Sequence, residues 1–484
     1  MANSERFTSR WGLILAAIGM AVGAGNIWRF PRMVAENGGS AFLIAWLIFL
    51  FLWSIPLLIA EFAIGKHTRQ GTIGSFGRIM GDKFAWMGSF VGFCTMAIMF
   101  YYSVVTGWSL FYLVQSVSGG LTSGADYASV WDSFTTSYWP LLFHLIAISF
   151  AAFVINRGVV RGIERVAKIF VPLLFVLLII AAVRALFLPN AAAGLNFLFY
   201  PDLEKLFDYR VWLQGLSQSA WSTGAAWGLI LTYAVYMKEK EDVNMNAFLT
   251  GLGNNSASLI VALAVIPTVF SILSEAEAHE AMNAGNQGLT FIWMPKLFEQ
   301  MPLGDAFSAV FFLALFIAAL SSLIPMVELT TRIFIDFGLT RKRAVSFVWL
   351  GTLLLGVPSA LSLDVFNNQD WTWGLGLIVS GFFFAMAVRK FGAEDFRVKL
   401  VNTAPHDLHV GKWYSFILKY VIPIEFAVLI IWWSYQSVTS YETEGWWNPF
   451  KPYSLGTCIF QWGVALVLFK LFNNKIVSTI KVQA

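Results

Sequence analysis

The stretch GMAVGAGNIWRFPR, residues 19–32, interrupts a segment that otherwise has the composition of a membrane-spanning helix. The chain is apolar before it (WGLILAAI, 11–18) and after it (AFLIAWLIFLFLWSIPLLIA, 41–60). The stretch itself holds three glycines together with asparagine, arginine and proline. Such residues weaken a helix in lipid, because backbone groups left unpaired in hydrocarbon cost several kcal/mol. The interruption therefore predicts a functional break rather than an ordinary span.

The composition is that of a polytopic membrane protein. Hydrophobic residues make up 58% of the chain, charged residues 12%, and the mean hydropathy is +0.67. A spanning helix needs about 20 mostly apolar residues, and runs that would suit a membrane β-barrel should alternate, which these do not. The sequence therefore predicts an all-α membrane protein with twelve spans, at roughly 11–37, 40–66, 85–116, 139–156, 164–187, 211–237, 245–272, 305–335, 343–361, 370–389, 413–436 and 453–472.

Lysine and arginine in the predicted loops indicate the orientation of the chain. They are concentrated in the loops that share a side with the N-terminus, such as 66–83, 157–168 and 389–412. The opposite loops are acidic, for example at Asp126 and Asp305. We expect both termini in the cytoplasm, no cleavable signal peptide, and a multi-pass location in a bacterial cytoplasmic membrane.

A second interruption, STGAAWG at 222–228, falls in the sixth predicted span. The first and sixth spans each begin a group of five, and paired interruptions at corresponding positions are typical of inverted-repeat secondary transporters. The sequence therefore predicts one transporter domain over 1–484, with repeat one at about 11–187, repeat two at about 211–389, and helices 11 and 12 at about 413–472. Glycines in membrane helices also mark close packing, but packing does not require Asn26, Arg29 or Pro31.

Five motifs resemble those of the neurotransmitter:sodium symporter family. They are GMAVGAGNIWRFPRMVAENGGSAF (19–42), PLLIAEFAIG (56–65), YYSVVTGW (101–108), LTYAVY (231–236) and ALSS (319–322). The resemblance extends in order over about 7–472 and points to the bacterial amino-acid branch with the leucine-transporter fold. It implies a five-plus-five inverted repeat with discontinuous helices 1 and 6. It also implies import of an amino acid or amine by alternating access, coupled to Na⁺.

The resemblance implies two sodium sites built from neutral oxygens, the ligands that a hard cation prefers. The first site would use the Ala21 carbonyl, Asn26, Ser222 and Asn254, together with the substrate carboxylate. The second would use carbonyls of Gly19, Val22 and Ala318 and hydroxyls of Ser321 and Ser322. The alternative for the two serine hydroxyls is bonding back to their own helix.

Gly23 decides the substrate class that the resemblance implies. Amine-transporting relatives have aspartate at this position, so a substrate here should bring its own carboxylate, as an amino acid does. The implied binding residues are Ala21, Gly23, Gly25, Ile98, Tyr102, Trp221, Ser222, Gly224, Ala225, Trp227, Ser322 and Met326. Trp227 beside Gly224 is similar to the arrangement in glycine transporters and favours a small neutral amino acid. If the tryptophans only pack, larger hydrophobic or aromatic amino acids are the alternative.

The resemblance also raises a chloride site. Ser258 stands four residues after Asn254, where chloride-independent bacterial relatives tend to have glutamate. Two Na⁺ and a zwitterion call for some compensating negative charge. We hypothesise that Cl⁻ binds near Trp46, Gln218, Ser222, Asn254 and Ser258. Trp46 departs from the family tyrosine, although an indole N–H is a donor.

The resemblance also implies two gates. Arg29 and Asp370 match the outer pair, although Arg29 alone would also suit a snorkelling helix end. Asp336 matches the inner acid, whose usual partner is an arginine in an Arg-x-x-Trp start. Ser4 and Phe7 occupy those two positions here, and Arg6 lies nearby but out of register. The buried acids Glu61 and Glu328 are interpreted as scaffold hydrogen-bonders.

Three other functions remain open. A channel would need a repeated polar filter, and a membrane enzyme would need a catalytic or metal-binding set; neither pattern is visible, so no enzyme activity is expected. A substrate sensor on the same fold is the third possibility. The expected partners are a small neutral amino acid, Na⁺ and the lipid bilayer, with no nucleic acid, and the protein would be a monomer or homodimer.

Overall fold

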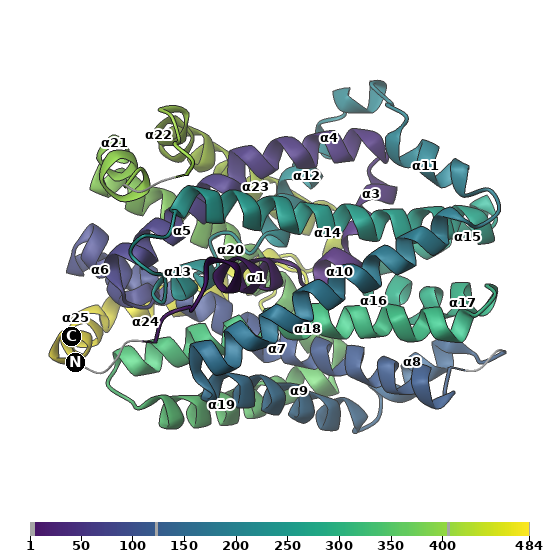
Figure 1. The fold of residues 1–484 in the computed structure, drawn as a ribbon, viewed down its shortest axis with the longest axis horizontal. Helices are drawn as coiled ribbons and strands as arrows, with labels where there is room; N and C mark the ends of the chain where they lie inside the picture. Colours follow the sequence, from purple (N-terminus) through teal and green to yellow (C-terminus); the bar gives the residue numbers. More distant parts are fainter. Residues whose placement is uncertain (1–4, 122–123, 404–406, 484) are drawn as a thin grey trace.

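The computed structural model describes residues 5–121, 124–403 and 407–483. Within them the chain is helical and contains no strand. Most helices run along one long direction, with both termini at the same end (Figure 1). We refer to this as the terminal end, and to the end that bears α8, α15 and α17 as the opposite end.

Helices follow all twelve predicted spans. The first six are α1 (Arg10–Ala21) with α2 (Ala24–Trp28) and α3 (Phe30–Glu36); α4 (Ser40–Phe49) with η1 (Leu50–Ser54) and α5 (Ile55–Thr68); η2 (Asp82–Phe84) with α7 (Ala85–Ser118); α9 (Trp139–Asn156); η3 (Val159–Glu164) with α10 (Arg165–Leu186); and α12 (Tyr209–Ser222) with α13 (Leu229–Ala234). The other six are α14 (Val243–Ile272); α18 (Gly304–Asp336); α19 (Arg341–Leu361); α20 (Leu363–Phe391); α22 (Trp413–Phe416) with η7 (Ile417–Val421), α23 (Ile422–Gln436) and η8 (Ser437–Tyr441); and α24 (Leu455–Leu471) with α25 (Asn473–Gln483).

Short helices connect these spans. They are α6 (Thr72–Met80), α8 (Tyr127–Thr135), α11 (Ala191–Phe199), η4 (Glu204–Phe207), α15 (Glu275–Asn283), α16 (Gly285–Gln287), η5 (Gly288–Trp293), α17 (Met294–Glu299), α21 (Ala393–Phe396) and η6 (Arg397–Val401). The long connection over 273–303 is thus mostly helical.

Length and composition qualify most of these helices as membrane spans. In the described residues, nine continuous helices pass that test, and two bent pairs, the first and the twelfth span, pass it as pairs. The sixth span is missing from that set because its two helices are separated by the irregular residues 223–228. The predicted fold class, all-α with twelve spans and discontinuous helices 1 and 6, is confirmed.

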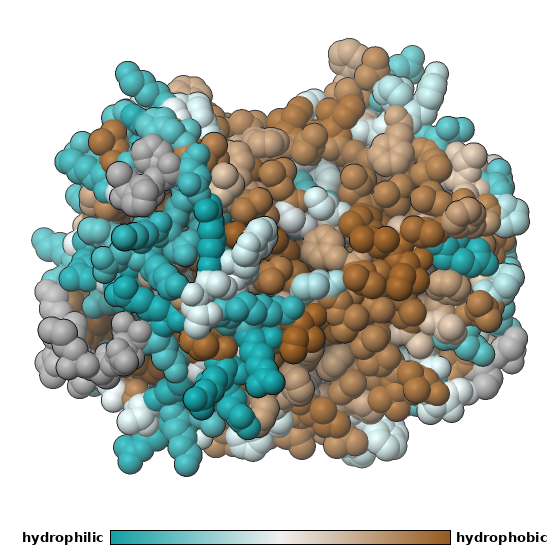
Figure 2. Space-filling model, in the orientation of Figure 1, coloured by the Kyte–Doolittle hydropathy of each residue, from teal (hydrophilic) through white to brown (hydrophobic). Residues whose placement is uncertain are grey.

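The surface agrees with a membrane location. Apolar side chains cover the middle of the visible face, and hydrophilic side chains gather at the terminal end (Figure 2). Large apolar residues such as Phe153, Ile169 and Ile431 are more than half exposed on the spans. Lipid satisfies such surface without a protein partner, because its tails are as apolar as leucine.

Both interrupted spans break where the sequence predicted. The axis of the first span bends by 54° between Ala21 and Ala24, and Val22 and Gly23 there are extended. The sixth span ends at Ser222 and resumes at Leu229. Between these helices Gly224, Ala226 and Gly228 all have positive φ, at 66°, 68° and 79°. Glycine adopts this conformation at little cost, which explains two of the three residues.

Candidate functional site

A cavity of about 440 Å³ lies between the two breaks. Eleven of the twelve predicted substrate-binding residues line it: Ala21, Gly23, Gly25, Ile98, Tyr102, Trp221, Ser222, Gly224, Trp227, Ser322 and Met326. The twelfth, Ala225, is buried and does not line the cavity. The predicted set thus converges from four different spans on one space in the middle of the molecule.

The break in the first span exposes the beginning of α2. The Ala24 amide donates to the Tyr102 hydroxyl at 3.0 Å, and the Gly23 amide donates to Asn26 Oδ1 at 2.9 Å. A Cβ on Gly23 would lie 2.8 Å from Ser322 Oγ and 2.9 Å from the Tyr102 hydroxyl. The site therefore has no room for a side chain at position 23, while the amides beside it suit a negatively charged ligand group.

The first predicted sodium site is a group of oxygens that face one another. Asn254 Oδ1 lies 2.9 Å from the Ala21 carbonyl oxygen and 3.1 Å from the Ser222 carbonyl oxygen, so no proton stands between these acceptors. Turning the amide of Asn254 over would satisfy the carbonyls with N–H groups. A cation satisfies all three oxygens without that turn, so the donor set fits Na⁺.

Asn26 and the Ser222 hydroxyl complete this cluster. Asn26 Nδ2 lies 2.8 Å from Asn254 Oδ1 and 3.4 Å from Ser222 Oγ. Asn26 and Asn254 are almost fully buried. The four residues predicted for the first sodium site therefore meet at one place, next to the amides of the first break.

The residues predicted for the second sodium site also gather. Ser321 Oγ lies 2.9 Å from the Ala318 carbonyl oxygen and 3.4 Å from the Val22 carbonyl oxygen. A Cβ on Gly19 would lie 3.6 Å from Cβ of Ser321. Ser322 differs, since its hydroxyl donates to the Met20 carbonyl at 2.9 Å. The neutral oxygens of this group again fit a hard cation such as Na⁺.

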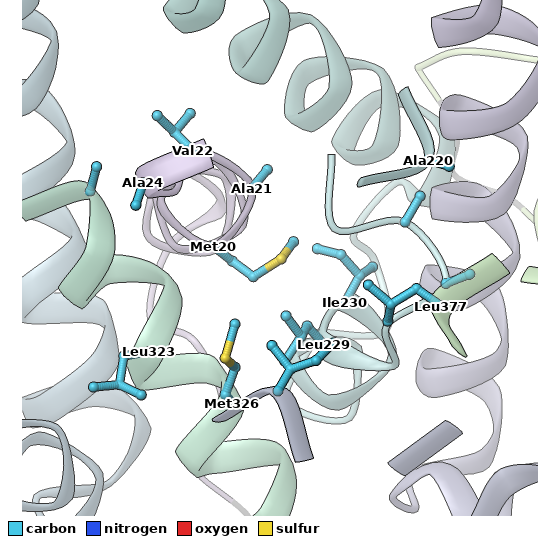
Figure 3. Packing of buried hydrophobic residues seen from close by; sticks show 14 of the residues in the cluster. Met20, Ala21, Val22, Ala24, Ala220, Leu229, Ile230, Leu323, Met326 and Leu377 are labelled. Carbon is cyan, nitrogen blue, oxygen red and sulfur yellow. The ribbon is translucent and has the colours of Figure 1, made fainter. Parts of the chain in front are cut away.

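Two methionines shape the floor of the cavity. Met20 from α1 and Met326 from α18 point into the same space, with Leu229 of α13 beside them (Figure 3). A Cβ on Gly224 would lie 2.7 Å from Met20 Sδ. The Met20 thioether therefore fills the space that a side chain at position 224 would need, and this flexible group adapts its shape easily. Nothing in the sequence singles out Met20, because a methionine in an apolar helix is ordinary.

The outer pair is present but not joined. The guanidinium of Arg29 lies 4.5 Å from the centre of the Trp221 ring, and Asp370 accepts a hydrogen bond from the Tyr101 hydroxyl at 2.9 Å. The structure describes both charged side chains, and no ion pair connects them. The cavity extends beyond Arg29 and Asp370 toward the opposite end, where Asn286 and Tyr441 line it.

The inner residues do not meet as the resemblance suggested. Asp336 pairs with Arg332 on its own helix at 2.7 Å and accepts the Gly71 amide at 2.6 Å. Arg6 instead pairs with Glu239 at 3.6 Å. Arg6, which is out of register with the family arginine, thus does not pair with Asp336 in this structure, because Arg332, four residues away on α18, does. Ser4 lies outside the described residues.

The first segment is nevertheless packed over the terminal end of the site. Phe7 is buried and lies edge-on against Tyr233, with ring centres 5.9 Å apart. Its amide donates to the Tyr236 carbonyl at 3.2 Å. Together with the unjoined outer pair, this packing makes the structure open toward the opposite end and closed toward the terminal end.

The residues proposed for chloride include buried groups without partners. Trp46 Nε1 and Gln218 Oε1 have no hydrogen-bond partner in the described part of the chain. Ser258 Oγ accepts from Asn26 Nδ2 at 2.7 Å, so this hydroxyl adjoins the first sodium cluster. A buried indole N–H without a partner suits an anion.

Both buried acids have backbone or ion-pair partners. Glu61 accepts the Ala226 amide at 2.5 Å and the Leu231 amide at 3.1 Å. Glu328 pairs with Arg341, with one nitrogen on each carboxylate oxygen at 2.8 and 3.0 Å. These contacts agree with the interpretation of the two acids as scaffold groups.

Known proteins resemble the chain over most of its length. The profile of the Sodium:neurotransmitter symporter family matches residues 4–136 and 128–478. An uncharacterised sodium-dependent transporter of Methanocaldococcus jannaschii is 32% identical over 88% of this chain and 89% of its own length. A sodium- and chloride-dependent taurine transporter of Bos taurus is 26% identical over 87% of this chain and 76% of its own length.

The fold is similar to that of a solved transporter structure. The crystal structure of MhsT in complex with L-phenylalanine covers 89% of this chain and 99% of MhsT, with a TM-score of 0.77 and 30% sequence identity. The family and the relatives that this chain matches are transporters rather than enzymes. The breaks, the paired oxygen clusters and these matches lead to one conclusion: the chain belongs to the sodium:neurotransmitter symporter family, whose members are multi-pass, sodium-dependent membrane transporters.

Proposed function

We propose that the protein is a symporter that imports a neutral amino acid together with Na⁺ by alternating access. One observation carries this proposal: the Gly23 and Ala24 amides and the Tyr102 hydroxyl at the first break lie beside the oxygen cluster of Asn254, Ala21 and Ser222. A substrate carboxylate placed there meets helix-terminal amides on one side and a cation on the other. Sodium and substrate then stabilise one another, because each neutralises the charge of the other.

The second oxygen cluster supports a second Na⁺. Its carbonyl and hydroxyl oxygens connect α1 with α18, through Val22 and Ser321. An ion that bridges two spans favours the arrangement in which they lie close together. Two ions per cycle are therefore the stoichiometry that we propose.

A small side chain fits the cavity floor best. Trp221 and Trp227 both line the cavity, and Met326 lies below them. Little space is left at Gly224, because a Cβ there would lie 2.7 Å from Met20 Sδ. Glycine and alanine are the substrates that this arrangement favours.

A larger hydrophobic or aromatic substrate is the second candidate. The cavity of about 440 Å³ has volume beyond the needs of glycine, and MhsT, at 30% identity, was solved with L-phenylalanine. The Met20 thioether can move out of the space beside Gly224, which would enlarge the pocket.

Chloride is proposed as the compensating anion. The Ser258 hydroxyl adjoins the first sodium cluster, and Trp46 Nε1 is a buried donor without a partner among the described residues. The bovine taurine transporter is named as chloride-dependent. We also place the terminal end in the cytoplasm of a bacterial cell, since lysine and arginine are concentrated in its loops.

Uptake into proteoliposomes tests the proposal. Radiolabelled glycine, alanine, phenylalanine and tryptophan are offered under an inward Na⁺ gradient or an equal K⁺ gradient. Symport predicts accumulation above the external concentration in Na⁺ only, strongest for the small substrates. Equilibration without accumulation would indicate a channel. Tight sodium-dependent binding without uptake would indicate a sensor, and preference for the aromatic pair would select the second candidate.

A further inference from the structure

Helix α5 and Arg69, the residue that follows it, contact both ends of the short helix α13. Near the start of α13, the carboxylate of Glu61 accepts the Ala226 and Leu231 amides. At the other end of α13, the guanidinium of Arg69 donates to the carbonyls of Ala234, Val235 and Met237. A carboxylate at the first turn and a cation at the last turn both complement the helix dipole. The two side chains thus hold α13 from its two ends.

Arg69 is placed for this contact by its backbone. It follows α5 directly and adopts a left-handed conformation, with φ of 59°. Its Nη1 lies 3.4 Å from the Ala234 oxygen, 2.9 Å from the Val235 oxygen and 2.5 Å from the Met237 oxygen. The last carbonyls of a helix have no partner within the helix. The Ala234 carbonyl also accepts the Met237 amide at 3.1 Å, so Arg69 acts mainly on the Val235 and Met237 carbonyls that directly follow α13.

The two helices also touch between these ends. A Cβ on Gly65 would lie 2.8 Å from Cβ of Ala234 and would overlap the Leu231 carbonyl. Gly65 stands midway between Glu61 and Arg69 in sequence. The close approach that glycine allows here brings the Arg69 side chain within reach of the carbonyls.

The backbone at Arg69 is joined in turn to α18. Arg332 donates to the Arg69 carbonyl at 3.3 Å, and Asp336 accepts the Gly71 amide at 2.6 Å. Arg332 and Asp336 also pair with each other at 2.7 Å. Asp336, the expected partner of an N-terminal arginine, is therefore engaged with the segment 69–71 instead.

The N-terminal segment also contacts the residues that follow α13. The Phe7 amide donates to the Tyr236 carbonyl at 3.2 Å, and Arg6 pairs with Glu239 at 3.6 Å. Arg6 and Glu239 are well exposed, so their pair contributes little. Among the described contacts at this end, the side chain of Arg69 makes the largest number of bonds to the segment 234–237.

We propose that Arg69 is the gating residue at the terminal end, the one that fastens the end of α13 to α5 and α18 while the cavity is open to the opposite end. Opening toward the terminal end then requires the guanidinium to leave its three carbonyls. Arg69 takes the part that the Arg-x-x-Trp start and Asp336 have in the resemblance. The inference rests on alternating access as proposed above.

The test compares Arg69→Ala with Arg78→Ala in protein reconstituted into nanodiscs. Arg78 is a matched control, because it lies at the same end and donates to a helix-terminal carbonyl, that of Thr68, at 2.8 Å. Arg69→Gln, which keeps one amide donor, is the second variant if Arg69→Ala folds poorly. Hydrogen exchange of the segments 5–21 and 229–241 is measured by mass spectrometry, and the sodium concentration for half-maximal binding is measured with ²²Na⁺.

The proposal predicts that exchange in both segments rises about tenfold in Arg69→Ala. It also predicts a roughly fivefold rise in the half-saturating sodium concentration, because fewer molecules keep the sodium-competent, oppositely open form. Arg69→Gln should fall between, and Arg78→Ala should match the unmodified protein. Equal behaviour of the Arg69 and Arg78 variants overturns the proposal. Failure of the unmodified protein to take up any amino acid overturns the proposed function alone, since the exchange comparison needs no substrate.

Discussion

The guanidinium of Arg29 stacks over the ring of Trp221 at 4.5 Å rather than pairing with Asp370. Both Arg29 and Trp221 line the cavity, and Asp370 is held by the Tyr101 hydroxyl. A cation over an indole ring is stabilised without an anion. The Trp221 ring therefore holds the Arg29 side chain while the cavity is open toward the opposite end. Closing the cavity requires the guanidinium to move from this ring to the Asp370 carboxylate.

Asp370→Asn should weaken apparent substrate affinity about tenfold, with sodium binding unchanged. Closure over the substrate would then lack the carboxylate that receives Arg29, whereas the sodium clusters lie deeper. Substrate binding in saturating Na⁺ measures this, with ²²Na⁺ binding measured in parallel. Asp364→Asn, an exposed acid on the same helix, is the control. Equal losses in the two variants would contradict a gate.

Gly23→Ala should weaken substrate binding much more than Gly25→Ala. A methyl group on Gly23 meets Ser322 Oγ at 2.8 Å and the Tyr102 hydroxyl at 2.9 Å, whereas a methyl group on Gly25 meets nothing within 4 Å. Overpacking costs about 1–3 kcal/mol, which corresponds to a roughly ten- to hundredfold loss of affinity. Equilibrium binding of the preferred amino acid measures the affinity of both variants. A loss of affinity of the same size in Gly25→Ala would argue against a carboxylate site at Gly23.

Ser321→Ala should raise the half-saturating sodium concentration about tenfold, since a ligand to a charged group contributes about 1.5–3 kcal/mol. The matched control is Ser109→Ala, a buried serine of α7 whose hydroxyl donates only to the Val105 carbonyl at 3.0 Å. ²²Na⁺ binding provides the measurement. If the two variants behave alike, the Ser321 hydroxyl merely bonds back to its own helix, as its contact with Ala318 at 2.9 Å would permit.

Replacing chloride by gluconate should reduce uptake by the unmodified protein severalfold and leave uptake by Ser258→Glu unaffected. A carboxylate at position 258, beside Asn26, would supply the fixed negative charge that the sodium cluster lacks. Ser258→Gln has nearly the same shape without the charge and should remain dependent on chloride. Uptake by the unmodified protein that is the same in both anions would remove the chloride site from the proposal.

Much of the fold follows from local composition. Long apolar runs predict the spans because a helix is one of the few structures that satisfy the backbone in lipid. The helix breaks at residues 23 and 223–228 can also be predicted from the sequence, since glycine and polar residues stand out in apolar runs. The candidate site followed from motif residues whose spacing a resemblance could match, such as Asn26 and Asn254. Motifs do not state which side chains compete for a partner, and for that reason the pairing of Asp336 was not foreseen.

The sequence by itself determined the class of protein, the two breaks and the types of oxygen that gather there. Only the tertiary structure decided which groups meet: Asn254 Oδ1 with the carbonyls of Ala21 and Ser222, Met20 with the space beside Gly224, and Arg69 with the end of α13. The physical reason is the range of the forces involved. Hydropathy and helix breaking act over a few neighbouring residues, whereas an ion cluster or a gate depends on ångström distances between spans far apart in the chain.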